Sequence, residues 1–255
     1  MTLKQQSSTT QSPQQVQHST IGDTPVIISR PRTPKATLML AHGAGAPMDS
    51  EFMTRYSLTL SRYDICVLRF EFDYMAQRRT GGSKRPPPNI LVLVDQWRAL
   101  IHRQQAQRGD PIPFFIGGKS MGGRVATLLN AGNKSASKDK PAWEGVICLG
   151  YPFHPQKQPL KLRTQHLSDP MQPTLIIQGT RDALGNQEEV ISYALTSDIQ
   201  LHWINTANHD LKPLARSQIT HQNAIDDAAM ATNTFIEQCL QTQRTQKRAA
   251  KPFKN

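Results

Sequence analysis

The chain has 255 residues, 37% of them hydrophobic, and a formal net charge of +11. This length suits a single α/β domain, and no apolar run approaches the roughly 18 residues that cross a membrane. The first residues lack the apolar stretch of a signal peptide. Three widely separated cysteines without metal-type spacing predict reduced thiols, no bound metal and a cytoplasmic location.

The two ends differ in composition from the middle of the chain. Residues 1–23 are rich in Gln, Ser and Thr, and are predicted to be a disordered head because they offer few apolar groups to bury. Residues 243–255 are predicted to be a basic tail, which either solubilises the protein or touches an anionic surface. Nothing in the pattern indicates a specific nucleic-acid partner. Residues 24–242 remain as the folded domain.

Short apolar runs alternate with longer amphipathic segments through this domain. Strands are predicted at residues 26–29, 36–41, 65–70, 112–116, 145–149, 174–178 and 199–204. Helices are predicted at about 50–61, 89–107, 121–131, 186–195 and 222–241, and a long loop at 71–88. Several strands are continuously apolar, as expected when both faces of a parallel sheet are covered. The order predicts a three-layer, doubly wound, mostly parallel sheet.

The most informative segment is Gly118-Lys119-Ser120-Met121-Gly122, which lies between an apolar strand and a helical pattern. A serine in such a turn has a strained backbone, and small neighbours are needed on either side. The turn also places the serine at a helix N-terminus, where backbone N–H groups stabilise an oxyanion. The sequence therefore predicts that Ser120 is a nucleophile. The alternative is a glycine-rich loop whose serine only caps the helix.

The same residues resemble the end of a phosphate-binding Gly-x-x-x-x-Gly-Lys-Ser loop. That motif needs glycine at position 113, where this chain has Pro113. Residues 114–116 are predicted to form a strand, so no loop is left to hold a phosphate. The pattern excludes this nucleotide-binding interpretation.

An acid and a histidine follow two later strands, in the chain order that this arrangement requires. Asp182 comes after the strand at 174–178, and His209 after the strand at 199–204. Both sit where parallel sheets collect functional groups. His209 is predicted to be the general base and Asp182 its partner. Asp198 lies at the wrong end of its strand, and Asp210 is too close to His209 in the chain to reach its far ring nitrogen.

The loop after the strand at 36–41 begins His42-Gly43-Ala44, whose small residues let the backbone approach a substrate carbonyl. The N–H groups of Ala44 and Met121 are predicted to form an oxyanion hole. We expect His42 to support this loop rather than act as a base. An ordinary strand-to-helix turn is the alternative.

Segments after other strands suggest the walls of a substrate pocket. The candidate substrate-binding residues are His42, Tyr74, Tyr151 and Phe153. The predicted loop 71–88 contains four basic residues, Arg78, Arg79, Lys84 and Arg85. They would favour an anionic substrate, and the alternative is a solvated loop without a role in binding.

Several motifs recur in order over about residues 25–240: LMLAHGAGAPMDS, LRFEF.YM..RR, IGGKSMGGR, CLGYPFHP, LRTQHL, IIQGTRDALG and NHDLKP. Together they resemble bacterial α/β-hydrolase-like proteins related to dienelactone hydrolases. Eukaryotic proteins of the same group include a testis-expressed protein and a non-catalytic subunit of a histone acetyltransferase complex. The resemblance implies an α/β-hydrolase fold without a large lid domain and a Ser120–Asp182–His209 triad.

The expected function is hydrolysis of an ester, thioester or related acyl bond through an acyl-enzyme on Ser120, without metal or cofactor. The expected partner is a small acyl substrate. The alternative is a non-catalytic interaction or scaffold protein that keeps the same fold, because fold alone does not fix function.

Overall fold

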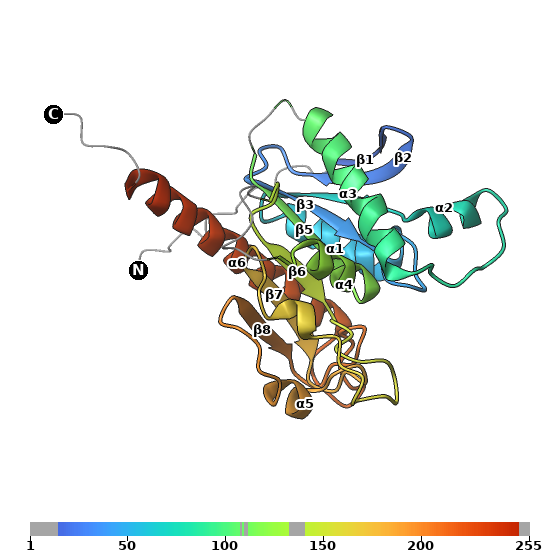
Figure 1. Cartoon of the computed structure of the whole chain (residues 1–255), viewed down its shortest axis with the longest axis vertical. Coiled ribbons are helices and arrows are strands. Elements are labelled where there is room, and N and C mark those ends of the chain that lie inside the picture. The colour runs from blue at the N-terminus through green and yellow to red at the C-terminus, as the bar shows by residue number, and fades with distance from the viewer. Residues whose placement is uncertain (1–14, 108, 110–111, 133–140, 250–255) are drawn as a thin grey trace, which may run out of the picture.

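The computed structural model describes residues 15–107, 109, 112–132 and 141–249. Its centre is one eight-stranded sheet in the order β1-β2-β4-β3-β5-β6-β7-β8 (Figure 1). The strands are β1 (Gln15–Ile21), β2 (Thr24–Arg30), β3 (Ala36–Ala41), β4 (Ile65–Phe70), β5 (Phe114–Lys119), β6 (Val146–Leu149), β7 (Thr174–Gly179) and β8 (Ile199–Ile204). The helices are α1 (Glu51–Ser61), α2 (Asp73–Arg79), α3 (Ile90–Gln107), α4 (Met121–Leu129), α5 (Gln187–Ile191) and α6 (His221–Ala249), with a 3₁₀ turn at Gln165–Leu167.

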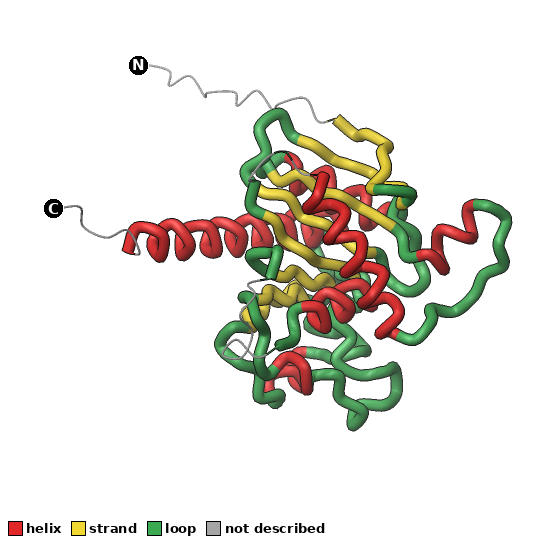
Figure 2. Tube along the Cα trace, turned by 45° about the horizontal axis from the view of Figure 1, so that its top comes forward, coloured by secondary structure: helices red, strands yellow, loops and turns green. Residues whose placement is uncertain are grey.

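Strands β3 to β8 are parallel, and helices cover both faces of the sheet (Figure 2). Helices α3 and α4 pack on one face around Trp97, while α1 and α6 pack on the other around Tyr56 and Phe235. Strands β3, β4, β5, β6 and β7 are buried along their whole length, which explains their continuously apolar sequences. The predicted three-layer, mostly parallel fold is confirmed, and the described chain carries no separate lid domain.

The first strand lies inside the segment that was predicted to be a disordered head. Residues 15–21 pair with β2 in an antiparallel hairpin, and β2 pairs antiparallel with β4. Strand β1 is mostly exposed, and of its side chains only Ile21 is buried. It is held by backbone hydrogen bonds at the edge of the sheet, so its sequence carries no apolar signal. Residues 1–14 lie outside the described part of the chain.

Helix α6 extends beyond the predicted end of the domain at residue 242 and continues to Ala249 (Figure 1). Its sequence contains no glycine or proline that would end it earlier, and Pro252 is the first such residue. The first seven residues of the predicted basic tail are therefore helical. None of the described helices is long and apolar enough to cross a membrane.

Three local differences concern the surroundings of the site. Strand β5 continues through Gly117 and Gly118 to Lys119, where the sequence predicted its end at residue 116. The predicted loop 71–88 contains helix α2. Helix α5 begins after a capping box at Asn186 and ends at Ile191, so it is five residues long and shorter than the helix predicted at 186–195. The three cysteines are free and buried.

Candidate active site

Ser120 occupies a tight turn between β5 and α4. Its backbone has φ 52° and ψ −113°, the strained conformation expected of the residue at this point. A Cβ atom on Gly118 would overlap the backbone carbon of Gly122, and one on Gly122 would lie 2.7 Å from the carbonyl oxygen of His42. The two glycines are needed because backbone occupies the space of their missing side chains.

His209 lies between Ser120 and Asp182. Its Nε2 is 2.7 Å from the Ser120 Oγ, and its Nδ1 is 2.8 Å from an Asp182 Oδ atom. The three residues follow β5, β7 and β8, so the parallel sheet brings its carboxyl-end loops to one edge. The Asp182 side chain is completely buried and that of His209 is 25% exposed. The carboxylate thus fixes the imidazole with Nδ1 protonated, which leaves Nε2 to accept a proton from Ser120.

A buried amide supports the carboxylate of Asp182. Gln178 donates to Asp182 at 2.9 Å and to the carbonyl oxygens of Tyr151 and Gly185, and its own oxygen accepts the Tyr151 N–H at 2.7 Å. The second oxygen of Asp182 accepts the N–H of Leu184 at 2.8 Å. Gln178 bonds the same carboxylate oxygen as His209 does, and together with the Leu184 N–H it fixes the orientation of the carboxylate.

Lys119 joins the serine turn to the histidine loop. Its Nζ donates to the carbonyl oxygen of His209 at 2.8 Å and lies 3.3 Å from a carboxylate oxygen of Asp210. The aliphatic stem is buried, and the ammonium lies 5.8 Å from the centre of the Phe52 ring. Burial lowers the pKa of Lys119. Asp210 therefore pairs with Lys119, and the carboxylate that contacts the ring of His209 is that of Asp182.

The loop after β3 places Ala44 beside the serine turn. Ala44, Ser120 and Met121 line the same cavity, and the hydroxyl of Tyr74 donates to the Ala44 carbonyl oxygen at 3.0 Å. The N–H of Met121 is one of the first groups of α4, which have no partner within the helix. Both N–H groups predicted for an oxyanion hole thus belong to residues at this cavity.

His42 supports this loop and does not face the cavity, so its prediction as a substrate-binding residue is wrong. It is fully buried, its Nε2 accepts the N–H of Phe72 at 3.2 Å, and its Nδ1 donates to the carbonyl oxygen of Gly43 at 2.6 Å. Burial lowers the pKa of His42, so the ring stays neutral. The expectation that it holds the loop agrees with these contacts.

The cavity beside Ser120 has a volume of about 570 Å³, and its walls come from six parts of the chain. The lining residues are Ala44, Pro87, Pro88, Asn89, Ile90, Leu93, Ser120, Met121, Arg124, Pro152, Arg163 and Leu184.

Three further predicted substrate-binding residues lie behind this cavity wall. Tyr151 and Phe153 are fully buried, and the Tyr151 hydroxyl donates to the Arg163 carbonyl oxygen at 2.8 Å. Tyr74 is 8% exposed and holds the loop of Ala44 instead of lining the cavity. Tyr151 and Phe153 follow β6 as predicted, but their side chains belong to the hydrophobic core, and Pro152 between them lines the cavity instead.

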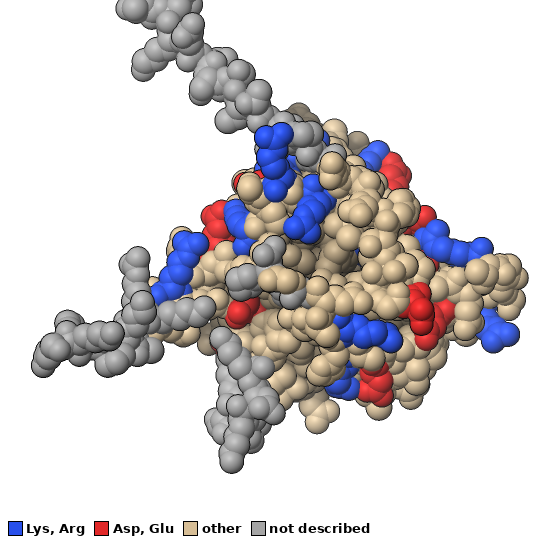
Figure 3. Space-filling model, turned by 90° about the horizontal axis from the view of Figure 1, so that it is seen from above, with Lys and Arg blue, Asp and Glu red and all other residues tan. Residues whose placement is uncertain are grey.

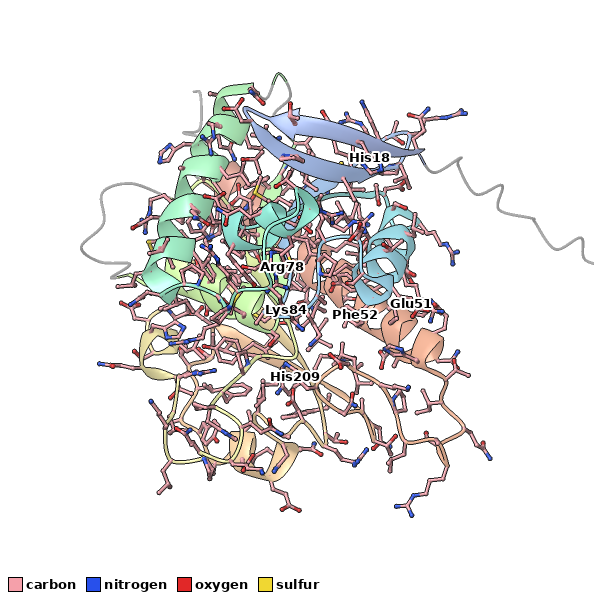
Figure 4. All side chains as sticks on the ribbon, turned by 90° about the vertical axis from the view of Figure 1, so that its right-hand side faces the viewer. His18, Glu51, Phe52, Arg78, Lys84 and His209 are labelled. Atoms are coloured by element: carbon pink, nitrogen blue, oxygen red, sulfur yellow. The ribbon has the colours of Figure 1, made fainter. Side chains whose placement is uncertain are left out.

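None of the basic residues of the segment 71–88 lines the cavity beside Ser120, so their predicted preference for an anionic substrate stays a prediction. The Arg79 guanidinium bonds to both oxygens of Glu71 and to Asp49, and Arg78 donates to the Arg85 carbonyl oxygen. Figure 4 shows Arg78 and Lys84 on the same side of the molecule as His209. On the face seen in Figure 3, basic and acidic residues are interspersed. No group of three or more potential metal ligands occurs within the described residues.

Gln178 and the cavity arginines Arg124 and Arg163 were not predicted as site residues, and Lys119 was noted only as part of the serine motif. A lysine and a glutamine at the ends of buried strands are signals in themselves, because a buried polar group needs a partner. Arg163 has no such signal, since it lies in a segment without regular secondary structure.

One family model, described as an alpha/beta hydrolase domain, matches residues 34–237. The chain is similar in structure to dienelactone hydrolase from Anabaena variabilis, with 17% identity and a TM-score of 0.61 over 89% of this chain and 98% of that chain. It is also similar to an α/β serine hydrolase homologue from Coxiella burnetii, with 17% identity and a TM-score of 0.60 over 88% of this chain and 97% of that chain. A third similar structure is an α/β serine hydrolase without a lid from Xanthomonas campestris, with 19% identity and a TM-score of 0.57 over 88% of this chain and 94% of that chain. At these identities the likeness shows the fold.

Proposed function

This chain belongs to the alpha/beta hydrolase domain family, and from that premise we propose that it is a serine hydrolase of ester, thioester or related acyl bonds. The observation that carries the proposal is the unbroken line of hydrogen bonds from Ser120 through His209 to Asp182. A serine hydroxyl is a weak nucleophile until an adjacent base takes its proton. His209 lies at hydrogen-bond distance for that task.

In the first half-reaction, the Ser120 Oγ forms a bond to the acyl carbon while its proton passes to His209 Nε2. The tetrahedral oxyanion accepts hydrogen bonds from the N–H groups of Ala44 and Met121. The bond to the leaving group then breaks, and the proton on His209 passes to the departing oxygen or sulfur. The product of this step is an acyl-enzyme on Ser120.

In the second half-reaction, a water molecule takes the position that the leaving group occupied beside His209. It gives a proton to His209 and attacks the acyl carbon, and the proton returns to Ser120 as the acid departs. Throughout, Asp182 stabilises the imidazolium and keeps the ring in place. No step in this sequence needs a metal or cofactor. We further propose that the protein acts on a small acyl substrate in the cytoplasm.

A fluorophosphonate probe tests the proposal directly, because it reacts with an activated serine. We expect the probe to label wild type at Ser120, and to fail with Ser120→Ala and react far more slowly with His209→Gln. Ser168→Ala is the matched control, since Ser168 is exposed and outside the site. If folded wild-type protein is not labelled and turns over no acyl substrate, the proposal is wrong, and the non-catalytic scaffold interpretation takes its place.

A further inference from the structure

Among the described residues, Arg124 and Arg163 are the only charged ones that line the cavity beside Ser120. Arg124 and Arg163 share a wall with mostly apolar groups, among them Ile90, Leu93 and Leu184. The described part of the chain contributes no acidic side chain to its lining. An apolar cavity with one small set of charged groups is typical of a site that orients a ligand with an apolar body and a charged end.

Arg124 lies one helical turn after the serine, and its N–H donates to the Ser120 carbonyl oxygen at 3.0 Å. Its side-chain Nε is buried and has no hydrogen-bond partner in the described structure. Buried polar groups are nearly always paired, so an unpaired one beside a nucleophile calls for a ligand. Neither this arginine nor Arg163 takes part in an ion pair with a described residue.

Arg163 is fixed in place through its backbone. Its N–H donates to the Phe153 carbonyl oxygen at 2.7 Å, and its own carbonyl accepts the Tyr151 hydroxyl at 2.8 Å. Burial, and then the charge of Arg124, lower the pKa of Arg163, although a guanidinium stays protonated. Two cations are thus held near each other without an anion, an arrangement that a bound anion would stabilise.

The position of the cavity indicates which part of a substrate it holds. A leaving group must face His209, because that ring supplies its proton. His209 does not line the cavity, whereas Met121 and Arg124 on helix α4 do. The cavity therefore lies on the side of Ser120 that receives the acyl group.

From these observations we infer that the preferred substrate has an acyl group ending in a carboxylate, which Arg124 and Arg163 bind together. The planar fork of a guanidinium matches the two oxygens of a carboxylate, and the apolar wall accommodates the methylene groups between the ends. The substrate class is a half-ester or half-thioester of a dicarboxylic acid. This inference rests on the proposed function and adds specificity to it.

The test compares p-nitrophenyl half-esters of succinate, glutarate and adipate with the p-nitrophenyl esters of butyrate, valerate and hexanoate, which match them in chain length. We expect kcat/KM of wild type to be at least about tenfold higher for one or more half-esters than for its neutral counterpart, as a charged hydrogen bond implies. Arg124→Met and Arg163→Met should each lower this ratio about tenfold. Arg98→Met, an exposed arginine on α3, is the matched control and should keep it.

A second measurement does not depend on turnover. Glutarate should protect Ser120 from fluorophosphonate labelling at lower concentration than valerate does, and Arg163→Met should remove that difference while melting as wild type does. If neutral esters are hydrolysed and Ser120 is labelled, yet no half-ester is preferred, the inference is wrong and the proposed function stands. Equal or better protection by inorganic phosphate, without half-ester preference, would also overturn it. Absence of both labelling and turnover would instead contradict the proposed function.

Discussion

Replacing Lys119 with methionine tests whether a buried ammonium holds the histidine loop against the serine turn. The change keeps the apolar stem and removes the group that donates to the His209 carbonyl oxygen at 2.8 Å. The Asp210 side chain is 70% exposed, so the ion pair with it contributes little. The Lys119 side chain is 10% exposed, and a charged hydrogen bond in such a place contributes about 2 kcal/mol.

If all of this free energy holds His209 in position, its loss lowers the rate at which Ser120 reacts with a fluorophosphonate about 30-fold, since each 1.4 kcal/mol is a factor of ten in rate. The assay is the second-order rate constant for fluorophosphonate labelling. Asp210→Asn is the matched control, because it removes the ion pair and keeps the bond to the carbonyl oxygen, and we expect less than about a threefold change. Labelling of well-folded Lys119→Met at the wild-type rate would refute this reasoning.

Three further changes test other parts of the site. Gln178→Leu removes one donor to the buried carboxylate of Asp182 and leaves the Tyr151 N–H without its acceptor, so urea unfolding should show a loss of about 2–3 kcal/mol, and a smaller loss would mean that water replaces the amide. Gly122→Ala places a Cβ 2.7 Å from backbone oxygen, so probe labelling should fall at least about tenfold, and unchanged labelling would show that the turn can relax. Burial and the charge of Arg124 lower the pKa of His166 to about 4. On acidification, the unfolded chain takes up this proton at a higher pH than the folded protein does. The free energy of unfolding should therefore decrease by about 3 kcal/mol, through His166 alone, as the pH drops from 6.5 to 4. His166→Asn should flatten that slope in urea titrations, whereas the exposed control His102→Asn should not.

The parts of the fold that were predictable are those whose signals are local in the chain. The serine turn could be identified because the strand, the two glycines and the helix lie within a few residues of Ser120. Asp182 and His209 could be predicted since parallel strands end at the same edge of the sheet, so the order of loops fixes which residues meet there.

Other features depend on contacts between distant segments, and these could not be predicted. Strand β1 is polar and owes its place to pairing with β2, which no apolar period reports. Which side chains of residues 151–153 enter the core and which line the cavity depends on the hydrogen bond from Tyr151 to Arg163, twelve residues away in the chain. The long-range partner of Lys119 lies 90 residues further along the chain, beyond any local pattern.

The course of helix α6 determines how this protein can be attached to a surface. Leu240, Gln241 and Arg244 lie beside Lys35 and Pro113, which precede β3 and β5 at the edge of the sheet opposite Ser120. The last turns of the helix then project outward from that edge (Figure 1). A resin, a sensor chip or a fluorescent fusion partner joined to the C-terminus would therefore sit behind the sheet and leave the entrance at Ser120 open to solution.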